Sequence, residues 1–108
     1  MLDDREPMQT QMERAARGEN TGYVLRWNAK HGFQQVPGTE GPMPNGIQTT
    51  RDGTLMFVAL TATGEVRKYD LPHARLLAAA KVSRPDNLSW SPEGSLLVAG
   101  LAARCQNR

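Results

Sequence analysis

The sequence predicts an all-β fold, a partial β-propeller, and the main observation behind this prediction is an internal repeat of about 40 residues. Residues 21–28 return as residues 63–70, 42 positions later, and both copies begin with Thr-Gly. Residues 44–55 return as residues 85–96, 41 positions later; each copy begins with proline and carries an acidic residue before a glycine. A period of roughly 40–45 residues that holds four short strands is typical of one propeller blade.

The length allows about two blade equivalents of four-stranded antiparallel sheet. The chain has 108 residues, whereas a propeller needs at least about four blades of this size. We expect a polar lead over 1–20, a propeller region over 21–101 and a tail over 102–108. Within the propeller region a full blade spans 44–82, with half a blade on each side. Such a chain leaves sheet edges uncovered.

The polar lead is expected to form a short helix or to be disordered. Met8 and Met12 fall on one face of a helix, and Gly18 is a plausible stop. Asp3 with Glu6 would cap the start of such a helix.

Alternation of apolar and polar side chains predicts the strands, and glycines mark the turns between them. The segment 76–82 is ambiguous because its Leu-Leu-Ala-Ala-Ala-Lys run favours a helix. The repeat places the outer strand of a blade there, and we favour the strand because the repeat outranks local propensity. Strands are expected over 23–27, 33–36, 47–50, 55–60, 65–71, 76–82, 87–90 and 96–101.

Charge and composition exclude several classes of protein. The 13 basic residues nearly balance the 11 acidic ones and are dispersed, so we expect no nucleic-acid partner. No apolar run approaches the ~18 residues of a membrane-spanning helix, and the polar N-terminus does not resemble a signal peptide. We therefore expect a cytoplasmic protein with no membrane partner. Cys105 is the only cysteine, so no Cys/His metal spacing exists.

Polar side chains begin the innermost strands of two successive blades. Asn45 and Asp86 occupy matching positions of the repeat, and Asn87 follows directly. These positions lie beside the central channel, where oxygen ligands from successive blades can converge on one ion. Ca²⁺ takes about six to eight such oxygens. The alternative is structural: an Asn-Gly pair often forms a turn, and Asp86 could cap the turn after Pro85.

Residues 44–53, 64–70 and 85–99 together resemble the middle-to-late blades of the gluconolactonase/regucalcin-like family, and less closely the paraoxonases and strictosidine-synthase-like proteins. The resemblance extends over about 22–101. It implies a six-bladed propeller with Ca²⁺ or Zn²⁺ in the channel. It also implies hydrolysis of a small-molecule lactone or ester, in which the metal polarises the carbonyl and helps to activate water.

The resemblance implies roles for three residues. Asn45 matches the metal-binding asparagine of the family, and Asp86 matches its metal-binding aspartate, which can also serve as the catalytic general base. Asn87 matches the second residue of the paraoxonase-like Asp-Asn pair, where gluconolactonases usually have glycine. The metal-binding glutamate and a further asparagine of the family belong to earlier blades. We therefore expect a fragment of a hydrolase that binds Ca²⁺ weakly and is inactive or weakly active alone.

Two alternatives remain open at the level of sequence. The chain could be a non-catalytic binding or scaffold module, since many propeller repeats only present surfaces. It could also form a homo-oligomer. Three chains of two blade equivalents make six blades, and each first half-blade could complete the last half-blade of a neighbour in a closed cyclic assembly.

Overall fold

The computed structural model describes residues 7–101, and in these residues the chain is all-β with one short helix, as predicted. Strands make up 48% of the described residues, which confirms the all-β class, and their antiparallel sheets fit a partial propeller. The predicted cap of Asp3 with Glu6, the tail over 102–108 and Cys105 lie outside the described residues.

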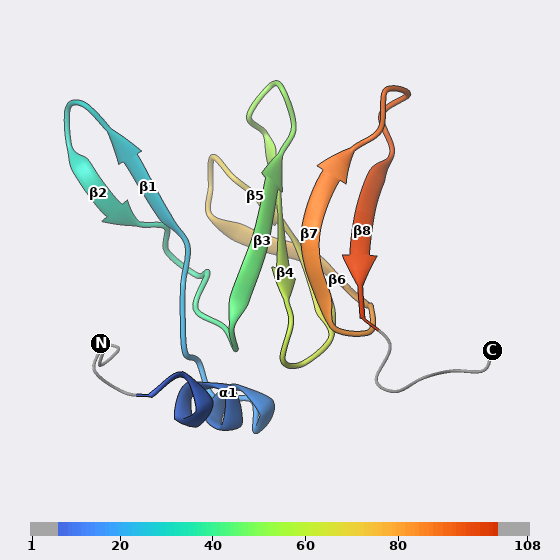
Figure 1. Ribbon diagram of the computed structural model, residues 1–108. Helices are drawn as coiled ribbons and strands as arrows, with labels where there is room; N and C mark the ends of the chain where they lie inside the picture. The colour runs from blue at the N-terminus through green and yellow to red at the C-terminus, as the bar shows by residue number, and fades with distance from the viewer. Residues whose placement is uncertain (1–6, 102–108) are drawn as a thin grey trace.

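Helix α1 (Met8–Ala16) lies beneath one end of the sheets (Figure 1). It ends two residues before Gly18, whose φ of 90° is the left-handed conformation that favours glycine, so the predicted stop is confirmed. Arg14 Nε donates a hydrogen bond to Glu19 Oε1 at 2.7 Å and ties the helix end to the chain that follows. No helix in the described part of the chain is long and apolar enough to cross a membrane.

Three antiparallel sheets follow one another in chain order and lie side by side (Figure 1). A two-stranded sheet (β1-β2) precedes a four-stranded one (β3-β4-β5-β6), and a second two-stranded sheet (β7-β8) follows. Every pairing joins strands that are neighbours in sequence. The strands are β1 (Leu25–Asn28), β2 (Gly32–Gln35), β3 (Pro44–Thr49), β4 (Leu55–Leu60), β5 (Glu65–Asp70), β6 (Arg75–Lys81), β7 (Pro85–Trp90) and β8 (Leu96–Gly100).

The ambiguous segment is a strand. β6 pairs with β5 from Lys81 opposite Glu65 to Arg75 opposite Asp70. A helix here would leave the edge of β5 without its partner, and the ladder outweighs the helix propensity of the alanines. All seven residues of β6 are exposed, as fits the outermost strand of a blade.

Strand β4 lies at the centre of the molecule because its two faces serve two different cores. One face joins a cluster that lies between the first and second sheets. The other face, with Ala59 and Phe57, joins a cluster between the second and third sheets. Phe57 also meets the ring of Trp90 edge to face at 5.7 Å between centroids. The first cluster contains Val36, Met56, Val58, Leu60 and Tyr69, and the second contains Ala59, Val66 and Leu88.

Candidate functional site

The starts of β3 and β7 are in direct contact, and a glycine makes this contact possible. A Cβ at Gly46 would lie 1.9 Å from the carbonyl oxygen of Asp86 and 3.3 Å from the Cα of Asn87. No side chain fits in that space, so the two inner strands touch through their backbones. Asn45 and Asp86 occupy matching positions of the internal repeat, and they therefore lie close together at the same end of neighbouring inner strands.

Thr61 links the two strands at this point. Its hydroxyl accepts a hydrogen bond from Asn45 Nδ2 at 3.2 Å and donates one to the carbonyl oxygen of Pro85 at 2.5 Å. Because Nδ2 is engaged, the amide oxygen of Asn45 is turned away from Thr61. No described residue donates a hydrogen bond to that oxygen, which leaves it available to a cation or to water.

Two further bonds fix β3 against β7 along their length. Gln48 Nε2 donates to the carbonyl oxygen of Leu88 at 3.2 Å, and Trp90 Nε1 donates to the carbonyl oxygen of Thr49 at 3.0 Å. These bonds run from side chain to backbone, since the two strands belong to different sheets. They hold the Asn45 end and the Asp86 end in a fixed relation.

The side chains of Asp86 and Asn87 have no hydrogen-bond or ion-pair partner among residues 7–101. Asp86 is half-buried, and Asn87 and Asn45 are exposed. An unpaired, half-buried carboxylate and an amide oxygen, at the matching starts of two strands in contact, have the chemistry of a hard-cation site. These oxygens suit Ca²⁺ better than Zn²⁺, which favours nitrogen and sulfur ligands.

The three residues supply fewer ligands than a complete Ca²⁺ site requires. Asn45, Asp86 and Asn87 supply at most three side-chain groups, whereas Ca²⁺ takes about six to eight oxygens. The described residues contain no group of three or more His, Cys, Asp or Glu side chains that could hold a metal. Further oxygens would have to come from water or from another chain.

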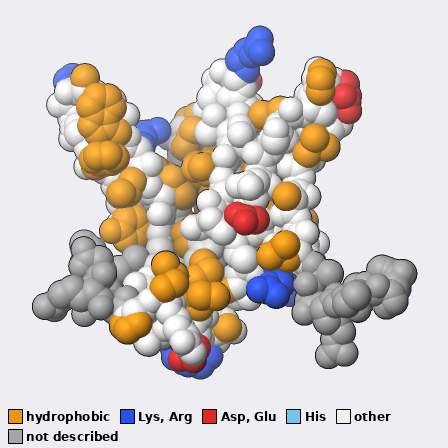
Figure 2. All heavy atoms as spheres, in the orientation of Figure 1, with side chains coloured by type: hydrophobic (Ala, Val, Ile, Leu, Met, Phe, Trp, Pro, Cys, Tyr) orange, Lys and Arg blue, Asp and Glu red, His pale blue; other side chains and the backbone are white. Residues whose placement is uncertain are grey.

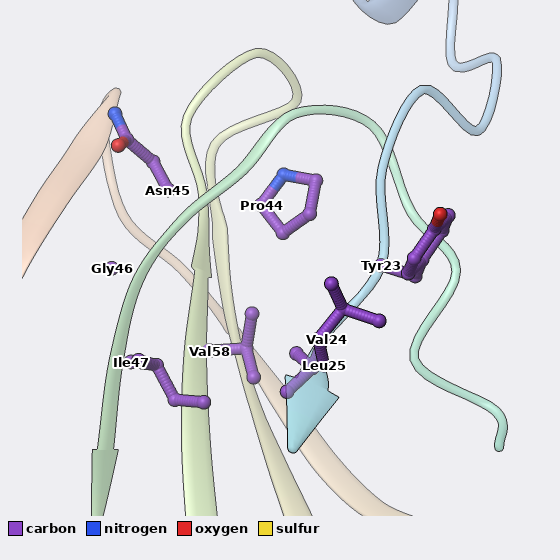
Figure 3. Close-up of a pocket in the computed structure, with 8 residues that line it drawn as sticks. All are labelled: Tyr23, Val24, Leu25, Pro44, Asn45, Gly46, Ile47 and Val58. Atoms are coloured by element: carbon purple, nitrogen blue, oxygen red, sulfur yellow. The ribbon is translucent and has the colours of Figure 1, made fainter. Parts of the chain in front are cut away.

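A pocket of about 220 Å³ lies beside Asn45, between β3 and the chain that leads into β1 (Figure 3). The side chains of Pro44, Val24 and Val58 gather around it, whereas the Asn45 amide points away toward the other side of β3 (Figure 3). The side chains that face the pocket are therefore apolar, and the amide group of Asn45 is turned away from it. Its lining residues are Tyr23, Val24, Leu25, Pro44, Asn45, Gly46, Ile47 and Val58.

The structure adds Thr61 to the residues that sequence reasoning found. It lies directly after the central strand β4, but no motif or periodicity marks it. Both histidines are exposed: His73 Nδ1 lies 2.9 Å from Asp70 Oδ2, and His31 donates its backbone N–H to Asn28 Oδ1.

No protein-family model matches the sequence, and no curated protein matches it. The resemblance to gluconolactonases remains a prediction from the motif residues around Asn45 and Asp86.

Proposed function

We propose that the chain supplies the Asn45–Asp86 corner of a divalent-cation site in the channel of a propeller that hydrolyses lactones or esters. The observation that carries the proposal is the contact at Gly46, which has no room for a Cβ and so keeps Asn45 and Asp86 side by side. The oxygen donors favour Ca²⁺ as the cation. We expect a single chain to hold it weakly, since it offers few ligands.

Each polar group of this corner has a definite task. The amide oxygen of Asn45 and the carboxylate of Asp86 hold the cation, which when bound polarises the carbonyl of a substrate. Thr61 acts as a positioning residue, because its hydroxyl fixes the Asn45 amide and the Pro85 carbonyl together. One oxygen of the Asp86 carboxylate would ligate the cation, and the other, which has no partner in the described residues, can accept the proton of an attacking water as general base.

Calcium titration by calorimetry tests the cation site. We expect Asp86→Asn and Asn45→Ala to abolish measurable binding. The matched controls are Glu13→Gln and Asn20→Ala, which make comparable changes at exposed positions outside the Asn45–Asp86 corner. Equal calcium affinity in all five proteins would refute the site.

Hydrolysis of a lactone and of an aryl ester, with and without added Ca²⁺, tests the reaction. A general base contributes about 10²–10⁴-fold to a rate, so Asp86→Asn should remove metal-dependent turnover almost completely. If calcium binds and depends on Asp86 but no substrate is hydrolysed, the chain has a cation site without this chemistry.

A second candidate function is a non-catalytic scaffold, and the exposed apolar face of β1 and β2 favours it. Leu25, Trp27 and Phe33 are 52–72% exposed, which is unusual for a face with no partner. This function predicts no calcium binding and no change in thermal stability on Asn45→Ala or Asp86→Ala.

A further inference from the structure

Two strands of the molecule lack a neighbour that their counterparts in the central sheet possess. By the repeat, β8 corresponds to β4 and β1 corresponds to β5. β4 and β5 pair with each other from Leu55 opposite Asp70 to Leu60 opposite Glu65. Among residues 7–101, however, β8 pairs only with β7, and β1 pairs only with β2. The central sheet separates β1 from β8 in the same chain (Figure 1), so one copy cannot join them.

The exposed side chains on these strands correspond to buried ones in the central sheet. Tyr69, 42 positions after Trp27, is 2% exposed and belongs to the first core cluster, whereas Trp27 is 62% exposed. In the structure β8 follows β4 by 40 positions, one fewer than in the sequence repeat, because Trp90 pairs with Leu96 where Thr49 pairs with Met56. Ala99 therefore takes the place of Ala59; Ala59 is fully buried, whereas Ala99 is exposed. The same residue positions that form a blade-to-blade core inside the chain are thus left open at its two ends.

The open face next to β8 contains a hollow that could accept the large side chains of the β1-β2 hairpin of another copy. A hollow of about 260 Å³ lies there with a floor of alanines from β6 and with Leu96 and Val98 at its side. With β8 aligned on β4 by this strand pairing, Trp27 and Leu25 take the places opposite Leu96 and Val98, as Tyr69 and Arg67 lie opposite Met56 and Val58. Large side chains would then fill a hollow floored by small ones. The lining residues are Phe57, Val66, Lys68, Ala78, Ala79, Ala80, Val82, Leu96 and Val98.

The apolar pocket beside β3 is the complementary gap at the other end of the chain. It is open along β1, and Ile47 at its wall is 46% exposed. In the central sheet, β3 and β4 precede β5. Because β1 corresponds to β5, the strands missing before β1 correspond to β3 and β4, and in a second copy β7 and β8 are their equivalents. A second copy that brings β8 to β1 also brings Leu97 and Ala99 toward Ile47 and closes this pocket.

We infer that copies of this chain join head to tail, with β8 of one copy paired antiparallel to β1 of the next, so that each junction completes a four-stranded blade. The register follows the central sheet: Leu96 lies opposite Trp27, Leu97 opposite Arg26, and Val98 opposite Leu25. This continues between chains the packing that joins the sheets within a chain. Each copy adds two blades, and three copies close a ring of six with no unpaired edge at the junctions.

The mass of the 108-residue chain in solution tests the assembly. We expect light scattering to give three times 11.9 kDa; two or four copies, which give four or eight blades, also support the inference. Trp27→Asp should reduce the mass to one chain, because it places a charge inside the junction. Lys30→Asp, in the exposed turn of the same hairpin, is the matched control and should leave the mass unchanged. A monomeric wild-type chain over the whole concentration range overturns the inference.

Disulfide trapping tests the register independently of affinity. In a Cys105→Ser background, we expect Arg26→Cys and Leu97→Cys, placed in separate chains and mixed, to form a cross-linked dimer under mild oxidation. Gln34→Cys, on the neighbouring strand β2, replaces Arg26→Cys in the control and should not cross-link with Leu97→Cys. Equal cross-linking of both pairs, or none of the first pair, overturns the proposed pairing. Neither experiment depends on calcium or on hydrolysis, so the assembly can fail while the proposed function stands.

Discussion

At the scale of single residues, the absence of a side chain at Gly46 allows the starts of β3 and β7 to lie in contact. Gly46 has no Cβ, and its backbone therefore approaches the carbonyl of Asp86 more closely than any other residue type could. The contact explains why Asn45 and Asp86 are neighbours although 41 positions separate them in the sequence.

Gly46→Ala should accordingly damage both stability and calcium binding. The added methyl would lie 1.9 Å from a backbone oxygen, so β3 and β7 must move apart. Overpacking of this kind costs about 1–3 kcal/mol, occasionally more, and chemical denaturation would measure it. Ser89→Ala, an exposed change on β7, is the control and should be neutral. A Gly46→Ala protein as stable as the wild type would show that the contact is loose.

The sequence predicted the pair Asn45 and Asp86 because both stand at the same position of a repeat. It did not predict Thr61, which bonds to Asn45 and to Pro85 across 16 and 24 positions. Such a contact depends on how two sheets pack, and no local pattern records it. The ligand roles of Asn45 and Asp86 therefore remain a prediction, whereas the contact that orients the Asn45 amide became visible only in the structure.

At the scale of elements, the repeat predicted the strands better than local propensity did. Residues 76–82 read locally as a helix, yet β6 forms there because β5 offers it a full ladder. The start of α1 lies outside the repeat, where the sequence offers only local signals. It begins at Met8 after Pro7, with no side-chain capping bond, and no repeat constrains that part of the chain.

The β5-β6 hairpin contains an acid-sensitive element at Asp70. A hydrogen bond from the His73 side chain, together with the His73 backbone N–H and the charges of His73 and Arg75, holds the pKa of Asp70 below its usual 3.8. The folded state thus favours the ionised carboxylate. This stabilisation is present above pH 3.8 and is lost as the pH falls through the lower pKa of the folded state.

Thermal unfolding across pH checks this element. Asp70→Asn should lower Tm at pH 7, and the Tm curves of variant and wild type should converge as the pH falls below 3.8. Glu13→Gln removes an equivalent charge from α1 and serves as the control. Parallel curves for Asp70→Asn and wild type would mean that the turn, and not the carboxylate charge, supplies the stability.

At the scale of the whole molecule, the proposed assembly would both cover the exposed apolar surface and add ligands to the incomplete cation site. Apolar side chains gather on the hairpin of β1 and β2 and along the strands at the opposite end (Figure 2). Joining these two ends covers both surfaces. By symmetry, a ring of three also brings three Asn45–Asp86 pairs to the same end of one channel. Two oxygens from each copy reach the lower limit of about six that Ca²⁺ requires.

Calcium binding should therefore depend on assembly. We expect about one ion for every three chains in a calorimetric titration of the wild type, with strong binding lost in Trp27→Asp. Trp27 supplies no oxygen ligand, so this loss can reach the site only through the junction between copies. Lys30→Asp should bind as the wild type does. If monomeric Trp27→Asp retains the wild-type affinity, one chain holds the ion alone. The cation site and the assembly would then be independent properties, because closing the ring would add no ligand that the Asn45–Asp86 pair lacks.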